Sequence, residues 1–138
     1  MKIDFKELLK NSAFKVTPPR LAILNVFSND CKPINAEYIF EKLKTKDINL
    51  VTIYRTLTSL EKAGILKRID LHKESAFYEL GDHHHHHIIC TSCGIVESFD
   101  ECDIKLLSAK VLKKSSKFKE INQHSLEFFG VCKACNKS

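Results

Sequence analysis

Four of the six cysteines in this 138-residue chain form two pairs, Cys90 with Cys93 and Cys132 with Cys135, and two residues separate the members of each pair. Each pair places two thiolates on one tight turn, and two such turns supply the four ligands of a closed tetrahedral zinc site with bonds of about 2.3 Å. A closed site leaves no open position for catalysis, so we predict a structural Zn²⁺ that supplies folding free energy. A redox dithiol and a chance pairing are the alternatives, and two matched pairs disfavour both.

Five consecutive histidines, residues 83–87, lie just before the first cysteine pair. The run is internal and leads directly into Cys90, so we interpret it as native and not as a purification tag. If this segment is a strand, its side chains alternate, which puts His84 and His86 on one face and the odd-numbered histidines on the other. One strand would then serve two separate metal sites.

On the odd-numbered face, Glu79 from the preceding segment could join His85 and His87. That set of nitrogen and oxygen ligands suits Zn²⁺, Fe²⁺ or Mn²⁺. On the even-numbered face, His84 and His86 need partners from further along the chain, and His124 is placed to be one. A single histidine in such a strand is more often a core residue bonded to the backbone, so the role of His124 depends on its partners.

The elements that must position these ligands follow from the hydrophobic periodicity. Helical spacing is expected over residues 3–12, after Thr17-Pro18, after Asn35 and from about residue 50 to 63, and β-like runs follow at 65–71 and 76–80. Four helices and then a hairpin resemble a winged helix-turn-helix. After residue 80 we expect strands at 83–93, 95–99 and 121–132 around a helix at about 100–114. The fold class is therefore α+β, with domains at 1–80 and 81–138.

In a winged helix-turn-helix, the last helix before the hairpin lies in the major groove of double-stranded DNA. Thr52, Tyr54 and Arg55 on that helix are the candidates for contacts with bases, and Lys15 and Arg20 are candidates for contacts with phosphates. The first 80 residues carry 14 basic and 10 acidic side chains, which favours nucleic acid. The same pattern also fits an amphipathic helix whose polar face only meets water.

The overall composition excludes a membrane protein. Apolar residues make up 43% of the chain and charged residues 28%, as in soluble globular proteins. No apolar run approaches the roughly 20 residues of a membrane span, and no signal peptide is recognisable. We therefore expect a cytoplasmic protein with reduced cysteines and no membrane partner.

Six motifs together resemble the ferric uptake regulator family of bacterial metal-responsive repressors, over nearly the whole chain. They are Lys15–Arg20, Thr52–Leu57, Phe77–Leu80, His83–Gly94, His124–Leu126 and Cys132–Cys135. The resemblance implies an N-terminal winged-helix DNA-binding domain and a C-terminal dimerisation domain. It also implies that a homodimer binds an AT-rich inverted-repeat operator when metal is present.

The resemblance assigns Glu79, His85 and His87 to a regulatory site between the domains, and His84, His86 and His124 to a second site within the dimerisation domain. Two departures from the family pattern matter. Many relatives supply a further histidine to the regulatory site from the loop where this chain has Lys32-Pro33, and Asp70, His72 or Cys31 could replace it. Relatives also have a carboxylate where this chain has Lys105, with Glu101 and Asp103 nearby, so we expect the second site to be altered or vacant.

The resulting hypothesis is a repressor of metal-uptake genes whose effector is Fe²⁺ or Zn²⁺, with Mn²⁺ as a further option. His86 stands where many iron-responsive relatives have Asp, which favours zinc. Peroxide sensing, known in one branch of the family, is an alternative. A zinc enzyme with Glu79 as its base, or a metal-storage module, is the rival from a different class. The recognition helix and hairpin argue against this rival, because an enzyme does not need them.

Overall fold

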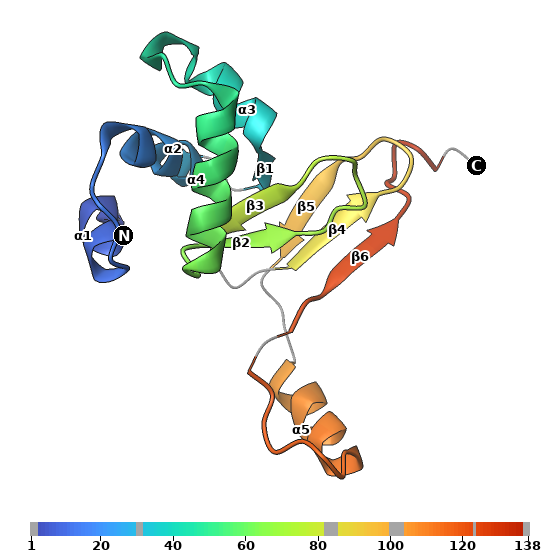
Figure 1. Ribbon diagram of the computed structural model, residues 1–138. Coiled ribbons are helices and arrows are strands. Elements are labelled where there is room, and N and C mark those ends of the chain that lie inside the picture. Colours follow the sequence, from blue (N-terminus) through green and yellow to red (C-terminus); the bar gives the residue numbers. More distant parts are fainter. Residues whose placement is uncertain (1–2, 30–31, 82–85, 100–103, 123, 137–138) are drawn as a thin grey trace. The chain divides into compact units, whose positions relative to one another are not determined.

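The computed structural model describes residues 3–29, 32–81, 86–99, 104–122 and 124–136. The chain divides into two compact units, residues 1–83 and 84–138, with the helices α1 to α4 in the first and α5 in the second (Figure 1). The α+β class that the sequence predicts is confirmed. None of the helices in the described residues is long and apolar enough to cross a membrane.

Local capping signals explain where the helices of the first unit begin. The helices are α1 (Phe5–Asn11), α2 (Pro18–Asn29), α3 (Ala36–Lys42) and α4 (Leu50–Lys62), with a 3-10 turn, η1 (Lys44–Lys46), before α4. Asn35 caps α3 by accepting a hydrogen bond from the backbone N–H of Tyr38 at 2.9 Å. Asn49 caps α4 in the same way, with 2.8 Å between its Oδ1 and the backbone N of Thr52. These side chains satisfy backbone donors that a helix leaves unpaired at its start.

A small antiparallel sheet completes the winged helix. Strands β2 (Leu66–Ile69) and β3 (Phe77–Leu80) form the expected hairpin, with Leu66 opposite Leu80. A two-residue strand, β1 (Ile34–Asn35), pairs with the other edge of β3, so the strand order is β1-β3-β2. The sequence does not predict β1, because two residues are too few for a period of two to appear in a pattern.

The core of the first unit lies where the helices pack on one another and on the sheet. Leu9, Ile23, Leu24, Ile39 and Leu57 are fully buried there. Ile53, Leu57 and Leu60 line one side of α4, at the spacing expected for an amphipathic helix. The opposite side of α4 is thereby held outward.

Two glycines lie where the end of α4 meets the end of β3. Gly64 has a φ of +79°, a left-handed conformation that ends the helix and that glycine adopts without a steric penalty. Gly81 donates a hydrogen bond to the Ile65 carbonyl at 2.8 Å, and a Cβ atom on Gly81 would lie 2.5 Å from the Gly64 carbonyl oxygen. The end of β3 can therefore approach the end of α4 only with glycine at position 81.

Replacing Leu57 by alanine is expected to lower the free energy of unfolding of the first unit by about 2–5 kcal/mol, because it leaves a cavity in a closely packed core. The matched control is Ser59→Ala, since Ser59 lies on the exposed side of the same helix. That change should stay within about 0.5 kcal/mol of the wild type. Urea unfolding followed by circular dichroism measures both, and equal effects of the two substitutions would contradict the packing that we describe.

The second unit has a three-stranded sheet of order β5-β4-β6. Strand β4 (His86–Cys90) pairs antiparallel with β5 (Val96–Phe99) and parallel with β6 (Glu127–Gly130), and α5 (Ile104–Lys114) lies between β5 and β6 in the sequence. Among its described residues, Ile89 and Cys90 are the only apolar side chains that are buried. A unit with so little apolar core needs another source of stability.

The expected strands of this unit are shorter than the sequence pattern suggested. Among the described residues of the strand expected at 121–132, Glu127–Gly130 form a regular strand, and there they pair with β4, which has five residues. The predicted ligands His84, His85 and Glu101, together with the alternatives Asp103 and Cys31, lie outside the described residues.

Candidate functional site

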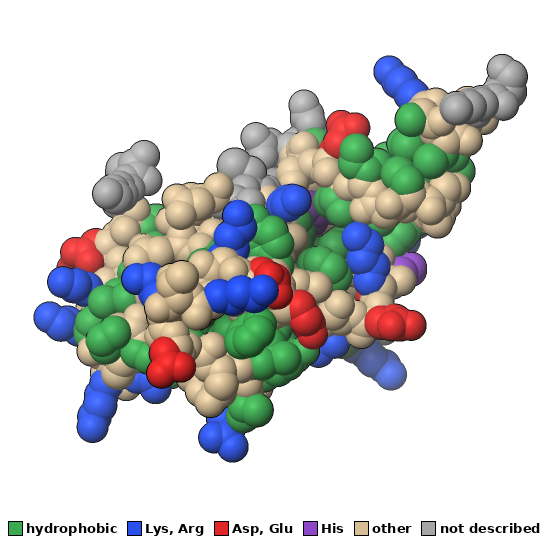
Figure 2. Space-filling model, turned by 90° about the horizontal axis from the view of Figure 1, so that it is seen from above, with side chains coloured by type: hydrophobic (Ala, Val, Ile, Leu, Met, Phe, Trp, Pro, Cys, Tyr) green, Lys and Arg blue, Asp and Glu red, His purple; other side chains and the backbone are tan. Residues whose placement is uncertain are grey.

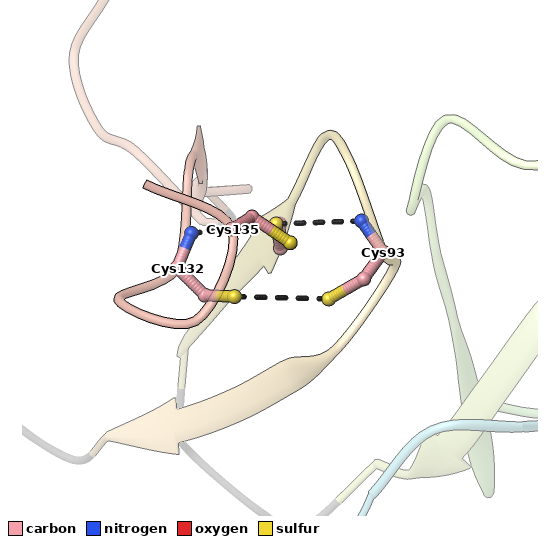
Figure 3. A group of neighbouring side chains, drawn as sticks. Cys93, Cys132 and Cys135 are labelled. Carbon is pink, nitrogen blue, oxygen red and sulfur yellow. Dashed lines mark hydrogen bonds between the residues drawn. The ribbon is translucent and has the colours of Figure 1, made fainter. Parts of the chain in front are cut away.

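The four predicted zinc ligands come together in the second unit. One sulfur from each of Cys90, Cys93, Cys132 and Cys135 lies within 4.8 Å of the other three. The Sγ atoms of Cys93 and Cys132 point toward each other and are 3.7 Å apart (Figure 3). A regular tetrahedron with Zn–S bonds of about 2.3 Å has edges of about 3.8 Å. The donor set and its spacing therefore fit a structural zinc ion, as the sequence predicts.

The backbone geometry of two tight turns orients the sulfurs of the four cysteines. Cys90 ends β4, and the turn after it is closed by the Gly94 N–H, which donates to the Cys90 carbonyl at 2.9 Å. Gly94 has a φ of +80°, which favours glycine at this position. The second turn is closed by the Cys135 N–H, which donates to the Cys132 carbonyl at 3.1 Å. Each pair of cysteines therefore lies on its own tight turn, and the parallel pairing of β4 with β6 brings the two turns together.

Backbone N–H groups surround the Cys90 sulfur. The Cys132 N–H donates to it at 3.3 Å, and the N–H groups of Ser92 and Cys93 donate at 3.4 and 3.5 Å. These donors, first of all that of Cys132, lower the pKa of Cys90 to about 6. Contacts with the Cys132 and Cys93 thiols, first of all Cys132, raise the pKa of Cys135 to about 12. All four thiols can lose their protons together only when a cation lies among them, which fits a metal-binding cluster.

His86 and His124, predicted for the second metal site, lie close together. Their ring centroids are 5.3 Å apart, and His86 is buried in β4. The Nδ1 of His86 lies 3.2 Å from the Leu126 carbonyl oxygen, which can only accept a hydrogen bond. A neutral His86 that donates from Nδ1 keeps the lone pair on Nε2, the arrangement usual for a histidine that binds a metal. Lys105, whose side chain is exposed, begins the first turn of α5 with Ile104.

Glu79 and His87, predicted for the regulatory site, are buried polar residues in different units. Glu79 lies on β3, where 4% of its surface is exposed, and Lys67 is its cross-strand neighbour, with Nζ 3.2 Å from the carboxylate Oε1. Tyr78 and Leu80, its neighbours on β3, belong to the apolar core, so Glu79 points to the opposite face of the sheet. His87 is fully buried on β4, where alternation puts it on the face opposite His86.

Two of the residues considered as a further ligand of that site lie in the turn of the wing. Asp70 accepts a hydrogen bond from the His72 backbone N–H at 2.9 Å, and both side chains are exposed. His72 has a φ of +56°, and its Nε2 lies 3.9 Å from Asp70 Oδ2. Asp70 and His72, as possible metal ligands, therefore form a local pair at the surface of the first unit.

The predicted DNA-reading residues lie along the outer side of α4. Tyr54 is 45% exposed and Arg55 is exposed, while Thr52 is partly exposed. No hydrogen bond or ion pair engages the Arg55 guanidinium in the described part of the chain. The Tyr54 hydroxyl donates to a carboxylate oxygen of Glu37 on α3. Arg55 is thus available to a ligand, whereas Tyr54 already has one partner.

Lys15 and Arg20, the predicted phosphate contacts, are linked to each other. The Arg20 Nη1 donates to the Lys15 carbonyl oxygen at 2.8 Å, and the guanidinium carbon lies 5.2 Å from the centre of the Phe14 ring. Arg20 therefore holds the loop that carries Lys15, and the exposed Lys15 side chain remains available. On the face drawn in Figure 2, basic side chains project singly among acidic and apolar ones, so no single-sign patch covers that face.

Sequence reasoning missed three residues that contact the predicted site residues. Glu37 bonds Tyr54, Lys67 pairs with Glu79, and Phe14 stacks with Arg20. The Lys67 contact could have been found by aligning the two strands of the predicted hairpin across its turn. The Glu37 contact has no signal in the sequence, because it depends on how α3 packs against α4.

Comparison with known proteins gives one consistent result. The model of the ferric uptake regulator family matches residues 11–129. The ferric uptake regulation protein of Bordetella parapertussis is 40% identical over 134 residues, which cover 94% of each chain.

Two solved structures are similar over almost the whole chain. The ferric uptake regulator of Francisella tularensis with iron is 35% identical with a TM-score of 0.75, and the match covers 90% of this chain and 96% of that one. The regulator of Helicobacter pylori, described as having three functional metal-binding sites, is 26% identical with a TM-score of 0.78. That match covers 97% of this chain and 90% of the other.

Proposed function

Because the chain belongs to the ferric uptake regulator family, we propose that it represses metal-uptake genes by binding an AT-rich inverted-repeat operator when Fe²⁺ is bound. Members of this family are dimeric, metal-responsive transcriptional regulators and not enzymes. The chain is therefore a DNA-binding regulator, and the zinc enzyme and the storage module considered from the sequence are excluded. We place the protein in the cytoplasm, where DNA and reduced thiols are both present.

The observation that carries the DNA-binding part of the proposal is the outer side of α4. An exposed Arg55 guanidinium can form a bidentate pair with guanine, and Thr52 and Tyr54 can reach neighbouring bases. Lys15 would neutralise a phosphate and contribute to a salt-dependent affinity, with Arg20 holding its loop in place. In this arrangement α4 reads bases, and the hairpin of β2 and β3 is the wing.

Homodimer formation is supported by the apolar surface of the second unit. Leu106, Leu107 and Phe118 are 67, 54 and 73% exposed, and Phe128 and Val131 near the second cysteine pair are 46 and 56% exposed. Apolar surface of this extent in so small a unit favours a protein partner. We propose that a second copy of the chain covers it, which would also place two α4 helices on the two halves of an inverted repeat.

We propose that Glu79, His85 and His87 bind the effector ion, with Asp70, His72 or Cys31 as a further ligand. Glu79 belongs to the first unit and His87 to the second, so one ion bound by both would couple metal binding to the DNA-binding unit. A hundredfold preference for the DNA-competent form corresponds to about 2.7 kcal/mol of coupling, which one or two ligand bonds can supply. Without the ion, Lys67 neutralises the buried Glu79 carboxylate.

Fe²⁺ is the effector that the ligand chemistry and the relatives favour together. Imidazole and carboxylate donors suit Fe²⁺, Zn²⁺ and Mn²⁺ alike. The Francisella relative was solved with iron, and the Bordetella relative is a ferric uptake regulation protein. Zn²⁺ is the alternative effector, and iron-dependent peroxide sensing is the alternative signal.

We propose that His86 and His124, with His84 and Glu101, hold a second ion. The 5.3 Å between the two rings and the bond from His86 to the Leu126 carbonyl support this assignment. Lys105 brings a positive charge to the helix position where relatives have a carboxylate, so we expect weaker binding here than at the regulatory site. The Helicobacter relative has three functional metal sites, which is the number we propose for this chain.

A gel-shift titration tests the proposed function. Purified protein is titrated into AT-rich inverted-repeat DNA under anaerobic conditions, with Fe²⁺, Zn²⁺, Mn²⁺ or a chelator. We expect retardation with Fe²⁺ at protein concentrations at least tenfold lower than with the chelator, and an affinity that falls as salt rises. Loss of the iron-dependent shift after hydrogen peroxide would instead support peroxide sensing.

The matched control for this titration is DNA of the same composition with one half of the inverted repeat scrambled. We expect it to bind weakly, because it offers only one half-site to a dimer. Equal binding with and without every ion would overturn the repressor proposal, and tighter binding with Zn²⁺ than with Fe²⁺ would reassign the effector.

A further inference from the structure

The hydroxyl of Tyr54 has a protein partner on a neighbouring helix. Tyr54 lies on the outer side of α4 with 45% of its surface exposed, and its hydroxyl donates to the carboxylate of Glu37. Glu37 is an exposed residue in the first turn of α3, the helix that packs beside α4 in Figure 1. The contact therefore joins the two helices of the helix-turn-helix at the surface that would face DNA.

The chemistry of this contact restricts what Tyr54 can read. A phenol has one proton to donate, and its oxygen can also accept hydrogen bonds. An ionised carboxylate can only accept, so the phenol proton is committed to Glu37 and the oxygen keeps its acceptor capacity. The same hydrogen bond raises the pKa of Tyr54 above its ordinary value of 10.0, so the phenol keeps its proton at neutral pH.

In the major groove, adenine N6 and cytosine N4 are the amines that donate hydrogen bonds, whereas the polar atoms of guanine and thymine there are acceptors. We propose that Glu37 is a specificity-determining positioning residue, which makes the Tyr54 hydroxyl an acceptor that reads an adenine or cytosine amine. The inference rests on the proposed function, because it requires that α4 enters the major groove.

A purely structural contact between α3 and α4 would have different consequences. Removing the carboxylate would then change stability, or would change the affinity for all DNA sequences equally through the lost negative charge. The proposed role instead changes the preference among bases at one position of each half-site. A base-resolved measurement therefore separates the two.

The test selects bound sequences from a randomised duplex library, using the full chain with Fe²⁺ or Mn²⁺ under anaerobic conditions. For the wild type we expect one position per half-site at which adenine or cytosine on one strand is preferred by about two- to tenfold, the range of a single net hydrogen bond. Tyr54→Phe should remove this preference. Glu37→Ala should also weaken it, because the freed hydroxyl can then donate to guanine or thymine as well.

Three further variants make the result specific. Glu41→Ala is the matched control, since Glu41 is an exposed carboxylate on the same helix that pairs with Lys44 and not with Tyr54. It removes the same charge and should leave the base preferences unchanged. Glu37→Gln keeps an oxygen that accepts the phenol proton, so it should retain at least part of the preference. In a Tyr54→Phe background, Glu37→Ala should have no further effect on base preference.

Titration of the Tyr54 phenol, followed by NMR of labelled tyrosine, shows whether the contact exists without DNA. Glu37→Ala should lower the pKa of Tyr54 toward its ordinary value, and Glu41→Ala should not. If Tyr54→Phe alters one position of the selected sequence but Glu37→Ala leaves it unchanged, the role of Glu37 is overturned. If the wild type selects no sequence with either ion, the proposed function fails, and this inference fails with it.

Discussion

Replacing Cys132 by serine is expected to remove the structural zinc and unfold the second unit. The four sulfurs lie within 4.8 Å of one another, and the loss of one leaves three thiols without the tetrahedral set that zinc requires. Structural zinc sites contribute about 10–16 kcal/mol of apparent binding free energy in small domains, which is comparable to the whole stability of a typical domain. The second unit has few buried apolar side chains to offset that loss.

Three measurements check this result. Metal analysis should show that the bound zinc falls from about one ion per chain to none. Sedimentation should show monomers in place of dimers, and DNA binding should be lost under all metal conditions. The N-terminal helices should nevertheless persist in circular dichroism, because their core belongs to the first unit.

Ser92→Ala is the matched control for the cysteine substitution. Ser92 is an exposed residue in the same turn, and it contributes to the Cys90 sulfur only through its backbone N–H. We expect wild-type zinc content and stability within about 0.5 kcal/mol. A Cys132→Ser protein that kept its zinc and its dimer would show that the cluster is not a structural metal site.

Replacing His85 and His87 together by alanine is expected to abolish metal-dependent DNA binding while the zinc of the cysteine cluster remains. The proposed effector ion would lose two nitrogen ligands, and Glu79 would remain paired with Lys67. If the ion supplies about 2.7 kcal/mol of coupling, the apparent affinity for the operator in the presence of Fe²⁺ should fall about a hundredfold, to its value in chelator.

The gel shift described above measures this loss, with metal analysis on the same samples. Ser98→Ala is the matched control, because Ser98 is exposed and lies directly opposite His87 on the neighbouring strand. It tests whether a small change in this sheet is enough to disturb DNA binding. We expect this variant to bind DNA like the wild type. Full metal-dependent binding by the double histidine variant would refute the assigned regulatory ligands.

The ion pair between Lys67 and Glu79 gives the proposed regulatory site a physical basis for its response to metal. A buried carboxylate without a cation is costly, and Lys67 offsets that cost at a distance of 3.2 Å. An effector ion has to compete with this ammonium group for Glu79. The ion pair would therefore set part of the concentration at which the proposed site responds.

Much of the local structure was predictable because it depends on neighbouring residues. The caps at Asn35 and Asn49, the amphipathic pattern of α4 and the glycine after it are short-range signals, and the helices begin where those signals lie. The cysteine cluster was predictable because two matched pairs have few other uses in a reduced protein. Its geometry in the structure agrees with the prediction.

Contacts between elements were much less accessible from the sequence. The alternation of His86 and His87 follows from the strand alone, but the approach of His124 to His86 depends on the parallel pairing of β4 with β6. Strand β1 exists only because β3 offers it an edge. In each case the sequence supplied the residue types, and the packing of distant segments decided which of them meet.

Residue types and short spacings by themselves determined the winged-helix pattern, the donor set of the zinc cluster and the family motifs, because these features are local in the chain. Only the tertiary structure decided that the Tyr54 hydroxyl bonds Glu37 and that His124 lies beside His86. These contacts arise from the packing of helices and the register of strands, which no local pattern encodes. Specific proposals about which atoms contact DNA bases and which bind a metal ion depend on these contacts.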